Sequence, residues 1–195
     1  AQLSTISDPF RETQGFGAEI TFPKNGVPRC VAPPLAHDKD MTQLAQPDPH
    51  IAPRMRDRID GIAAMHTAAG GAYSILGWVE GPAAEAADLR GVSEFLMDLM
   101  IDPDYACALM DRCVEVGIDF AKAQLEAGAD TIGVGDAIAS QVSPATYEAY
   151  IFEREQRLIN GIHAAGGRVR LHICGDTTHL LAWFARLDCD IIDLD

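Results

Sequence analysis

From residue 54 to the end of the chain, the spacing of hydrophobic residues changes repeatedly between one typical of helices and one typical of strands. Apolar residues recur every three to four positions in several segments, which predicts helices with one buried face. Short apolar or alternating runs lie between these segments and predict strands. The expected helices cover 54–69, a segment opening at 82, 95–101, 103–127, 144–165 and 178–187, and the expected strands cover 72–79, 131–134, 169–173 and 190–194. Strands that alternate with helices at this spacing indicate βαβ units and a parallel sheet.

The first 53 residues lack this regularity. Segments 20–22 and 29–31 are extended and flank a turn-like Pro-Lys-Asn-Gly-Val-Pro sequence, which predicts a small hairpin. Proline pairs at 33–34 and 47–49 then indicate loops. We interpret residues 1–53 as an irregular excursion over the scaffold, so that 1–195 form one partial domain.

The number of strands sets the expected architecture. A closed (β/α)8 barrel needs eight strands and ~250 residues. The pattern gives four core strands, no matching strand at the start of the chain, and a last strand in which the chain stops. We therefore expect an α/β fold that is the central part of a (β/α)8 barrel. Open edges at 72–79 and 190–194 would expose Ile75, Ile191 and Ile192, and a homo-oligomer could cover them.

Composition excludes several classes of partner. The formal net charge is −14, from 15 Lys+Arg against 29 Asp+Glu, which disfavours nucleic acid and anionic membrane surfaces. No run approaches the ~20 apolar residues of a membrane span. The five cysteines are scattered and odd in number, which favours reduced thiols in a cytoplasmic protein over a disulfide framework.

Candidate chemistry gathers at the end of the strand expected at 169–173. His172 and Cys174 are two residues apart and therefore point from the same face, just before a Gly-Asp-Thr-Thr turn. The carboxyl ends of parallel strands are where sites are built, and an imidazole beside a thiol is half of a zinc site. The alternative is a packed cysteine beside a histidine with an ordinary hydrogen bond.

Three further residues are candidates for the substrate pocket. Asp136 and Asp193 follow or end neighbouring strands, and Trp78 lies in the strand at 72–79. The aspartates are either helix caps and partners for Arg170, or groups that orient His172 and shape the pocket. Trp78 either lines the mouth of the site or packs against the sheet.

Several motifs together resemble one known family. They are Gly-Trp-Val-Glu-Gly-Pro at 77–82, Leu-Arg-Gly at 89–91, Ala-Gly-Ala-Asp at 127–130, Asp136, Ser-Pro-Ala-Thr-Tyr at 143–147 and Arg-Leu-His-Ile-Cys-Gly-Asp-Thr at 170–177. The combination resembles the uroporphyrinogen decarboxylase superfamily, and most of all its corrinoid-dependent branch, the methylcobalamin:coenzyme M methyltransferases. The resemblance runs from about residue 27 to residue 195.

The resemblance implies a TIM barrel and a zinc ion bound by His-x-Cys and a distant third cysteine. His172 and Cys174 match the first two ligands, whereas the third would lie beyond residue 195, and Cys189 does not match it. The implied reaction is zinc-dependent methyl transfer from methylcobalamin on a corrinoid protein to a thiol or similar small-molecule acceptor. One alternative is a cofactor-free uroporphyrinogen decarboxylase. A second is a non-catalytic fragment or binding module.

Overall fold

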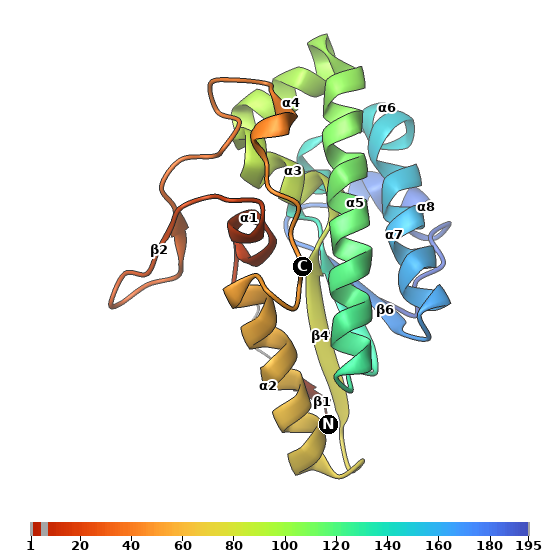
Figure 1. Ribbon diagram of the computed structural model, residues 1–195. Coiled ribbons are helices and arrows are strands. Elements are labelled where there is room, and N and C mark those ends of the chain that lie inside the picture. Colours follow the sequence, from red (N-terminus) through yellow and green to blue (C-terminus); the bar gives the residue numbers. More distant parts are fainter. Residues whose placement is uncertain (1, 5–7, 195) are drawn as a thin grey trace.

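The computed structural model describes residues 2–4 and 8–194 (Figure 1). Its centre is a parallel, five-stranded sheet in the order β1-β4-β5-β6-β7. The strands are β1 (Gln2–Ser4), β4 (Ser74–Glu80), β5 (Thr131–Gly135), β6 (Arg168–Ile173) and β7 (Ile191–Leu194). The expected parallel α/β arrangement is therefore confirmed, with β1 added to the four predicted strands.

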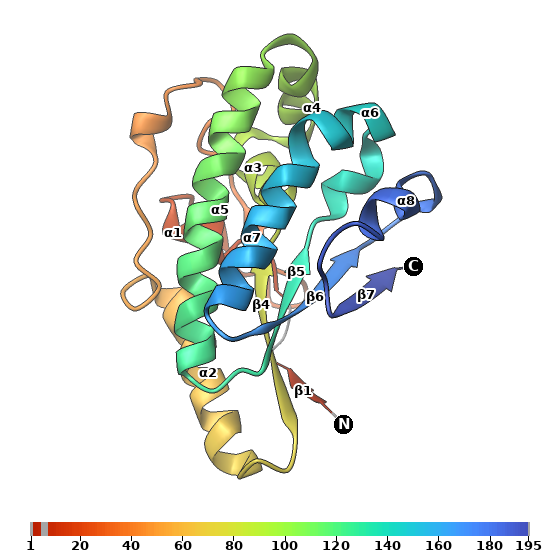
Figure 2. The same cartoon turned by 90° about the vertical axis from the view of Figure 1, so that its right-hand side faces the viewer.

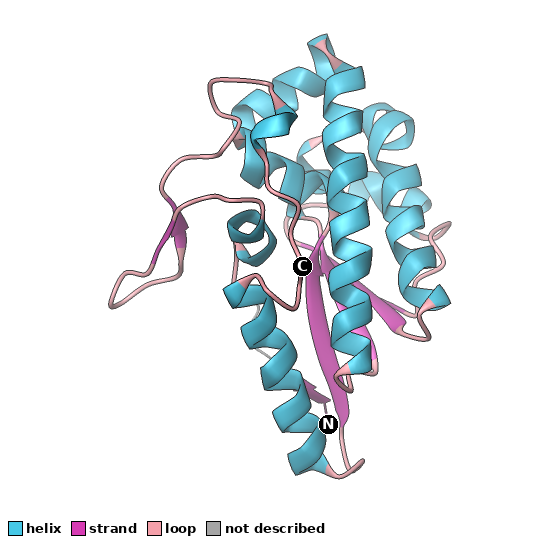
Figure 3. Cartoon of the chain, viewed as in Figure 1, coloured by secondary structure: helices cyan, strands magenta, loops and turns pink. Residues whose placement is uncertain are grey.

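Helices connect the strands and lie against the sheet. They are α1 (Arg11–Gly15), α2 (Pro53–Ala69), α3 (Pro82–Arg90), α4 (Val92–Ile101), α5 (Pro103–Glu126), α6 (Pro144–Thr146), α7 (Phe152–Ala164) and α8 (Leu181–Phe184). Short 3-10 helices span Met41–Gln43, Ala137–Gln141 and Thr178–Leu180, and a π-helical turn, Tyr147–Ile151, joins α6 to α7. Figures 2 and 3 show α5 and α7 side by side along one face of the strands.

Two sequence predictions about the edges are wrong. We expected no strand at the start of the chain, yet β1 pairs in parallel with β4, with Leu3 opposite Ile75. Ile75 is buried in the hydrophobic core, with 1% of its surface exposed, and its strand is not an open edge. A three-residue segment, Gln-Leu-Ser, is too short to show alternation, so only its pairing reveals it. The other edge is as expected, because Ile191 and Ile192 in β7 are 44% and 42% exposed.

Strand alternation separates the core from the other face of the sheet. Val169, Leu171 and Ile173 in β6 are fully buried, as their spacing predicts, and pack with the inward residues of α5 and α7. Because successive side chains point to opposite faces, Arg170 and His172 lie on the face away from these helices. This second face is where polar side chains are available for chemistry.

Local signals set most helix boundaries. Ser143 accepts a hydrogen bond from the Thr146 amide at 3.1 Å, which confirms it as the N-cap of α6. The expected helix over 144–165 is interrupted by the π-helical turn, and the one over 178–187 is shorter than predicted, consisting of a 3-10 turn and α8. Asp195, at the end of the last expected strand, lies outside the described residues.

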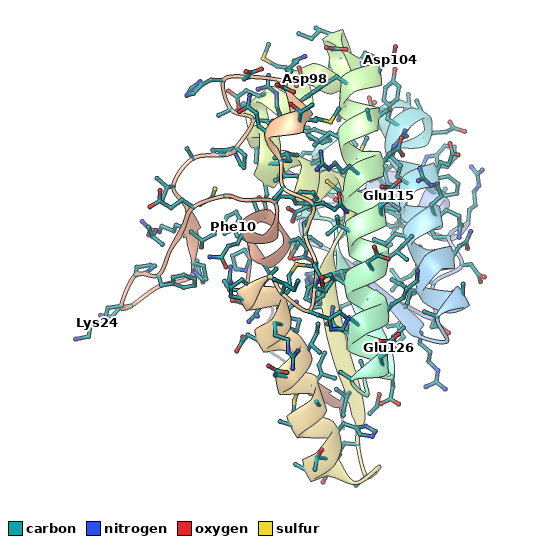
Figure 4. The ribbon with its side chains drawn as sticks, in the orientation of Figure 1. Phe10, Lys24, Asp98, Asp104, Glu115 and Glu126 are labelled. Atoms are coloured by element: carbon teal, nitrogen blue, oxygen red, sulfur yellow. The ribbon has the colours of Figure 1, made fainter. Side chains whose placement is uncertain are left out.

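The segment before α2 contains the predicted hairpin, β2 (Ile20–Thr21) paired antiparallel with β3 (Arg29–Cys30). Figure 4 shows Lys24 at its tip, projecting away from the rest of the molecule. Phe16 and Leu35 from this segment are buried in the common core. Arg112 of α5 anchors the following loop by donating to the carbonyls of residues 41, 44 and 45 at 2.7–3.0 Å. Over residues 2–4 and 8–194, no helix has the length and apolarity to cross a membrane.

Candidate active site

A pocket of ≈ 590 Å³ lies on the sheet face that α5 and α7 leave uncovered. All five strands of the sheet contribute to it, mainly through residues toward their carboxyl ends. Its lining consists of Gln2, Ser4, Leu76, Trp78, Glu80, Gly135, Ala137, Arg170, His172, Cys174 and Asp193. The pocket therefore contains four of the five residues that the sequence predicts as metal ligands or pocket residues, namely Trp78, His172, Cys174 and Asp193.

His172 and Cys174 are adjacent in this pocket. The His172 Nε2 atom lies 2.9 Å from the Cys174 Sγ atom. The strand places His172 on the pocket face, and Cys174 comes directly after the last residue of β6. The prediction that these two side chains point to the same side, within a few ångströms of each other, is confirmed.

Asp193 lies between two basic side chains on the neighbouring strand. It is paired in register with His172, and its Oδ2 atom lies 3.2 Å from His172 Nδ1. The same oxygen accepts a hydrogen bond from Arg170 Nη2. This hydrogen bond and the positive charge of the Arg170 guanidinium hold the pKa of the Asp193 carboxyl below its usual range. Asp193 is thus an ionised group facing one edge of the imidazole.

Trp78 occupies the middle of the pocket floor. Gly133 and Gly135 lie opposite Trp78 and Glu80 in the register of β4 and β5. A Cβ atom at Gly133 would lie 2.3 Å from Trp78 Cε3, and one at Gly135 would lie 2.7 Å from Trp78 Cζ2. The indole therefore lies over the bare backbone of β5, and its ring centre is 6.0 Å from that of His172.

Glu80 is a pocket residue whose role the sequence analysis did not identify. Its amide donates to Glu12 Oε1 at 3.0 Å, and its Oε1 atom accepts from Trp78 Nε1 at 3.3 Å. Burial, together with the negative charges of Glu12 and Asp88, raises the pKa of the Glu80 carboxyl well above its usual range. The sequence does contain a signal for Glu80 as a pocket residue, because it immediately follows the strand expected at 72–79 and precedes Gly81-Pro82.

Asp136 lies behind the pocket wall, although we expected it among the pocket groups. It is fully buried, and its carboxylate accepts the amides of Ala83 at 3.1 Å and Ala84 at 2.7 Å in the first turn of α3. Unsatisfied amides at a helix start attract a carboxylate, so the helix-cap alternative is confirmed. Burial raises the pKa of Asp136 to about 7.

Glu155 completes a buried acidic pair behind the wall. It is fully buried in α7, where Tyr147 donates a hydrogen bond to it. Burial, followed by the negative charge of Asp136, raises the pKa of Glu155 well above its usual range. No sequence pattern indicates this pair, because the two residues are far apart in the chain and Glu155 resembles a surface residue of a polar helix.

The pocket residues fit part of a zinc site. Nitrogen and sulfur ligands of tetrahedral zinc lie about 3.5 Å apart, given bond lengths of about 2.0 and 2.3 Å. His172 Nε2 and Cys174 Sγ, at 2.9 Å, need only a small side-chain rotation to reach this spacing. A carboxylate at the other imidazole nitrogen is the usual arrangement around a zinc-bound histidine, and Asp193 supplies it. Within the described ranges, no group of three or more potential ligands comes together, so the pair could supply only two ligands of a zinc site.

Comparison with curated proteins gives similarity to two kinds of enzyme. The chain is 30% identical over 179 residues to the methylcobamide:CoM methyltransferase MtaA of Methanosarcina barkeri, covering 90% of this chain and 51% of that protein. It is also 26% identical over 196 residues to the uroporphyrinogen decarboxylase of Streptomyces griseus, covering 97% of this chain and 52% of that protein. The chain thus spans about half the length of these relatives.

A solved structure shows the same architecture. A methyltransferase from Methanosarcina mazei superposes with a TM-score of 0.88 at 25% identity, over 97% of this chain and 56% of that chain. The curled parallel sheet is accordingly part of a TIM barrel, as predicted. The family model for uroporphyrinogen decarboxylase (URO-D) matches residues 3–195. Sequence, fold and family model agree: the chain belongs to the uroporphyrinogen decarboxylase family.

Proposed function

We propose that the protein transfers a methyl group from methylcobalamin, carried by a partner corrinoid protein, to a thiol or similar small acceptor, in a zinc-dependent reaction. The observation that carries this proposal is the adjacency of His172 Nε2 and Cys174 Sγ in the pocket, with Asp193 at the other imidazole nitrogen. A decarboxylase without cofactors has no need of this nitrogen–sulfur pair. The printed name of the MtaA relative, methylcobamide:CoM methyltransferase, also supports the proposal.

Each residue of the pair has a defined task in this reaction. His172 and Cys174 supply the neutral nitrogen and the thiolate sulfur that hold the metal, and a third protein ligand comes from outside the described residues. Zinc, when bound, stabilises the thiolate form of an acceptor at neutral pH and so makes it nucleophilic. The Asp193 carboxylate, 3.2 Å from Nδ1, favours a proton on that nitrogen through its charge and so keeps Nε2 available as a ligand, while Arg170 fixes the position of Asp193.

The position of the pocket suits a donor on another protein. The residues lie toward the carboxyl ends of the strands, where barrel enzymes bind their substrates. A corrinoid subunit would dock over these ends and present its methyl group to the pocket. With a net charge of −14, the chain is a poor partner for nucleic acid or an anionic membrane, and we propose that it acts in the cytoplasm.

Zinc content of the complete protein tests the first half of the proposal. We expect stoichiometric zinc in the wild type, and a large loss in His172→Ala and Cys174→Ser, because each removes one ligand. Cys30→Ser, in the hairpin far from the pocket, is the matched control and keeps its zinc. If both pocket variants retain wild-type zinc, the pair is not a ligand set.

Methyl transfer tests the second half. The complete protein is mixed with methylated corrinoid protein and a panel of thiol acceptors, and demethylation is followed by the cobalt absorption spectrum. We expect demethylation that depends on both His172 and Cys174. Decarboxylation of uroporphyrinogen by zinc-free protein would instead establish the alternative activity, and absence of both activities would favour a non-catalytic module.

A further inference from the structure

We propose that Trp78 is a positioning residue for the metal site: its indole, seated on Gly133 and Gly135, holds the His172 ring in the orientation that lets it bind a zinc-type cation together with Cys174. This inference rests on the proposed zinc site and assigns a role to a residue outside the ligand set. Three strands, β4, β5 and β6, share the pocket floor on which the indole lies.

The glycines make room for the indole. Gly133 and Gly135 are successive residues on the pocket face of β5, and both lack the side chain that would fill the floor. A Cβ atom added at these positions would lie 2.3 and 2.7 Å from Trp78 ring carbons, closer than Cβ atoms approach other carbons in proteins. Any side chain at either position therefore displaces the indole from its place.

The indole spans the sheet from β4 to β6. Glu80, Gly135 and His172 lie side by side in the strand register, and the indole covers the gap that Gly135 leaves between the other two. At the β4 side, Trp78 Nε1 donates to Glu80 Oε1 at 3.3 Å. At the β6 side, the ring meets the His172 imidazole at 6.0 Å between centroids and 55° between planes, within the usual range for tilted aromatic pairs.

Two contacts together restrict the imidazole. Asp193 faces the Nδ1 edge at 3.2 Å, and the indole packs against the ring from the β5 side. A single polar contact leaves the ring free to rotate about its two side-chain torsions, whereas a packed neighbour blocks that rotation. Groups that orient a metal-binding histidine typically change metal affinity by 10–100-fold when removed.

Metal affinity of variants measures this effect without any catalytic assay. We expect Trp78→Leu to weaken zinc binding to the complete protein by about tenfold or more, measured by competition with a chromophoric chelator. Trp78→Phe keeps one aromatic ring but lacks the second ring of the indole and the Nε1 donor. The zinc affinity of this variant should therefore lie between those of the wild type and Trp78→Leu. Gly133→Ala should weaken zinc binding as well, because it moves the indole without removing it.

Gly161→Ala is the matched control. Gly161 lies in α7, and its added Cβ would lie 2.6 Å from side-chain carbons of Ile118 in α5, a contact that involves neither Trp78 nor His172. It therefore disturbs packing between two helices without touching the glycines under the indole. We expect the folded fraction of Gly161→Ala to bind zinc with wild-type affinity, which separates a positioning effect from general destabilisation.

Fluorescence gives a second measure on the complete protein. Co²⁺ bound beside His172 should quench the emission of Trp78 at stoichiometric amounts. This quenched part of the emission should be retained in Trp183→Phe, because Trp183 packs near Phe152 and Arg186, and should be missing from Trp78→Phe at saturating Co²⁺.

The outcomes distinguish this inference from the proposed function. If Trp78→Leu and Gly133→Ala bind zinc as tightly as the wild type while His172→Ala does not bind it, Trp78 only fills space and the inference is wrong. If His172→Ala also binds normally, the proposed metal site itself has failed. Loss of affinity in Gly161→Ala equal to that in Gly133→Ala would likewise overturn the positioning role.

Discussion

Replacing Glu155 with glutamine should flatten the dependence of stability on pH. Glu155 is fully buried beside Asp136 and accepts a hydrogen bond from Tyr147. Burial and the neighbouring carboxyl raise its pKa well above the ordinary value of 4.5, so the folded chain holds this proton to a higher pH than the unfolded chain does. Glutamine has the shape of this neutral acid and carries no ionisable group.

The sign follows from proton binding in the two states. Above about pH 4.5 the unfolded chain releases the Glu155 proton and the folded chain retains it, so the free energy of unfolding falls as the pH rises. One retained proton corresponds to about 1.4 kcal/mol per pH unit, hence up to about 3 kcal/mol between pH 5 and pH 7. Asp136, whose pKa is about 7, adds a slope of the same sign.

Urea unfolding at pH 5, 6 and 7, with a chelator present, measures the effect. We expect Glu155→Gln to gain stability relative to wild type as the pH rises, by about 1–3 kcal/mol over this range. Glu153→Gln is the control, since Glu153 is exposed on the same helix, and it should keep the wild-type slope. Parallel wild-type and Glu155→Gln curves would refute the idea that Glu155 holds a proton in the folded state.

Two further predictions concern the stability of the scaffold. Asp98→Ala should cost about 3–5 kcal/mol in urea unfolding, because it removes the buried carboxylate that pairs with Arg90 at 2.8 Å and with Lys39 at 2.7 Å. Asp102→Ala, at a carboxylate exposed to solvent, should cost much less, and equal losses would contradict the argument. Ser143→Ala should cost about 1 kcal/mol through loss of the α6 cap, and an unchanged midpoint would show that the cap is dispensable.

The sequence predicted those parts of the fold that depend on local pattern. Alternation in the segment 169–173 correctly placed Val169, Leu171 and Ile173 in the core and His172 on the opposite face with Cys174. Turn and cap residues located the start of most helices. Because sites form at the carboxyl ends of parallel strands, the sequence also predicted that the pocket residues lie close together, although they are distant in the chain.

Features that depend on contacts between distant segments could not be predicted. β1 is recognisable only through its pairing with β4. Asp136 could serve as a pocket group or a cap, and only the position of the α3 amides decides between them. The acidic environment of Glu80 comes from Glu12 and Asp88 on other elements, so no local pattern reveals its raised pKa.

The packing of the Trp78 indole against Gly133 and Gly135 also limits which single substitutions these three positions can accept. Either glycine can acquire a side chain without displacing the indole only after residue 78 becomes smaller, because the indole occupies the space where the Cβ atom would lie. Conversely, a tryptophan fits at position 78 only where residues 133 and 135 of β5 are already glycine. The three positions should therefore vary together among relatives, with large side chains at 78 confined to sequences that keep glycine at 133 and 135.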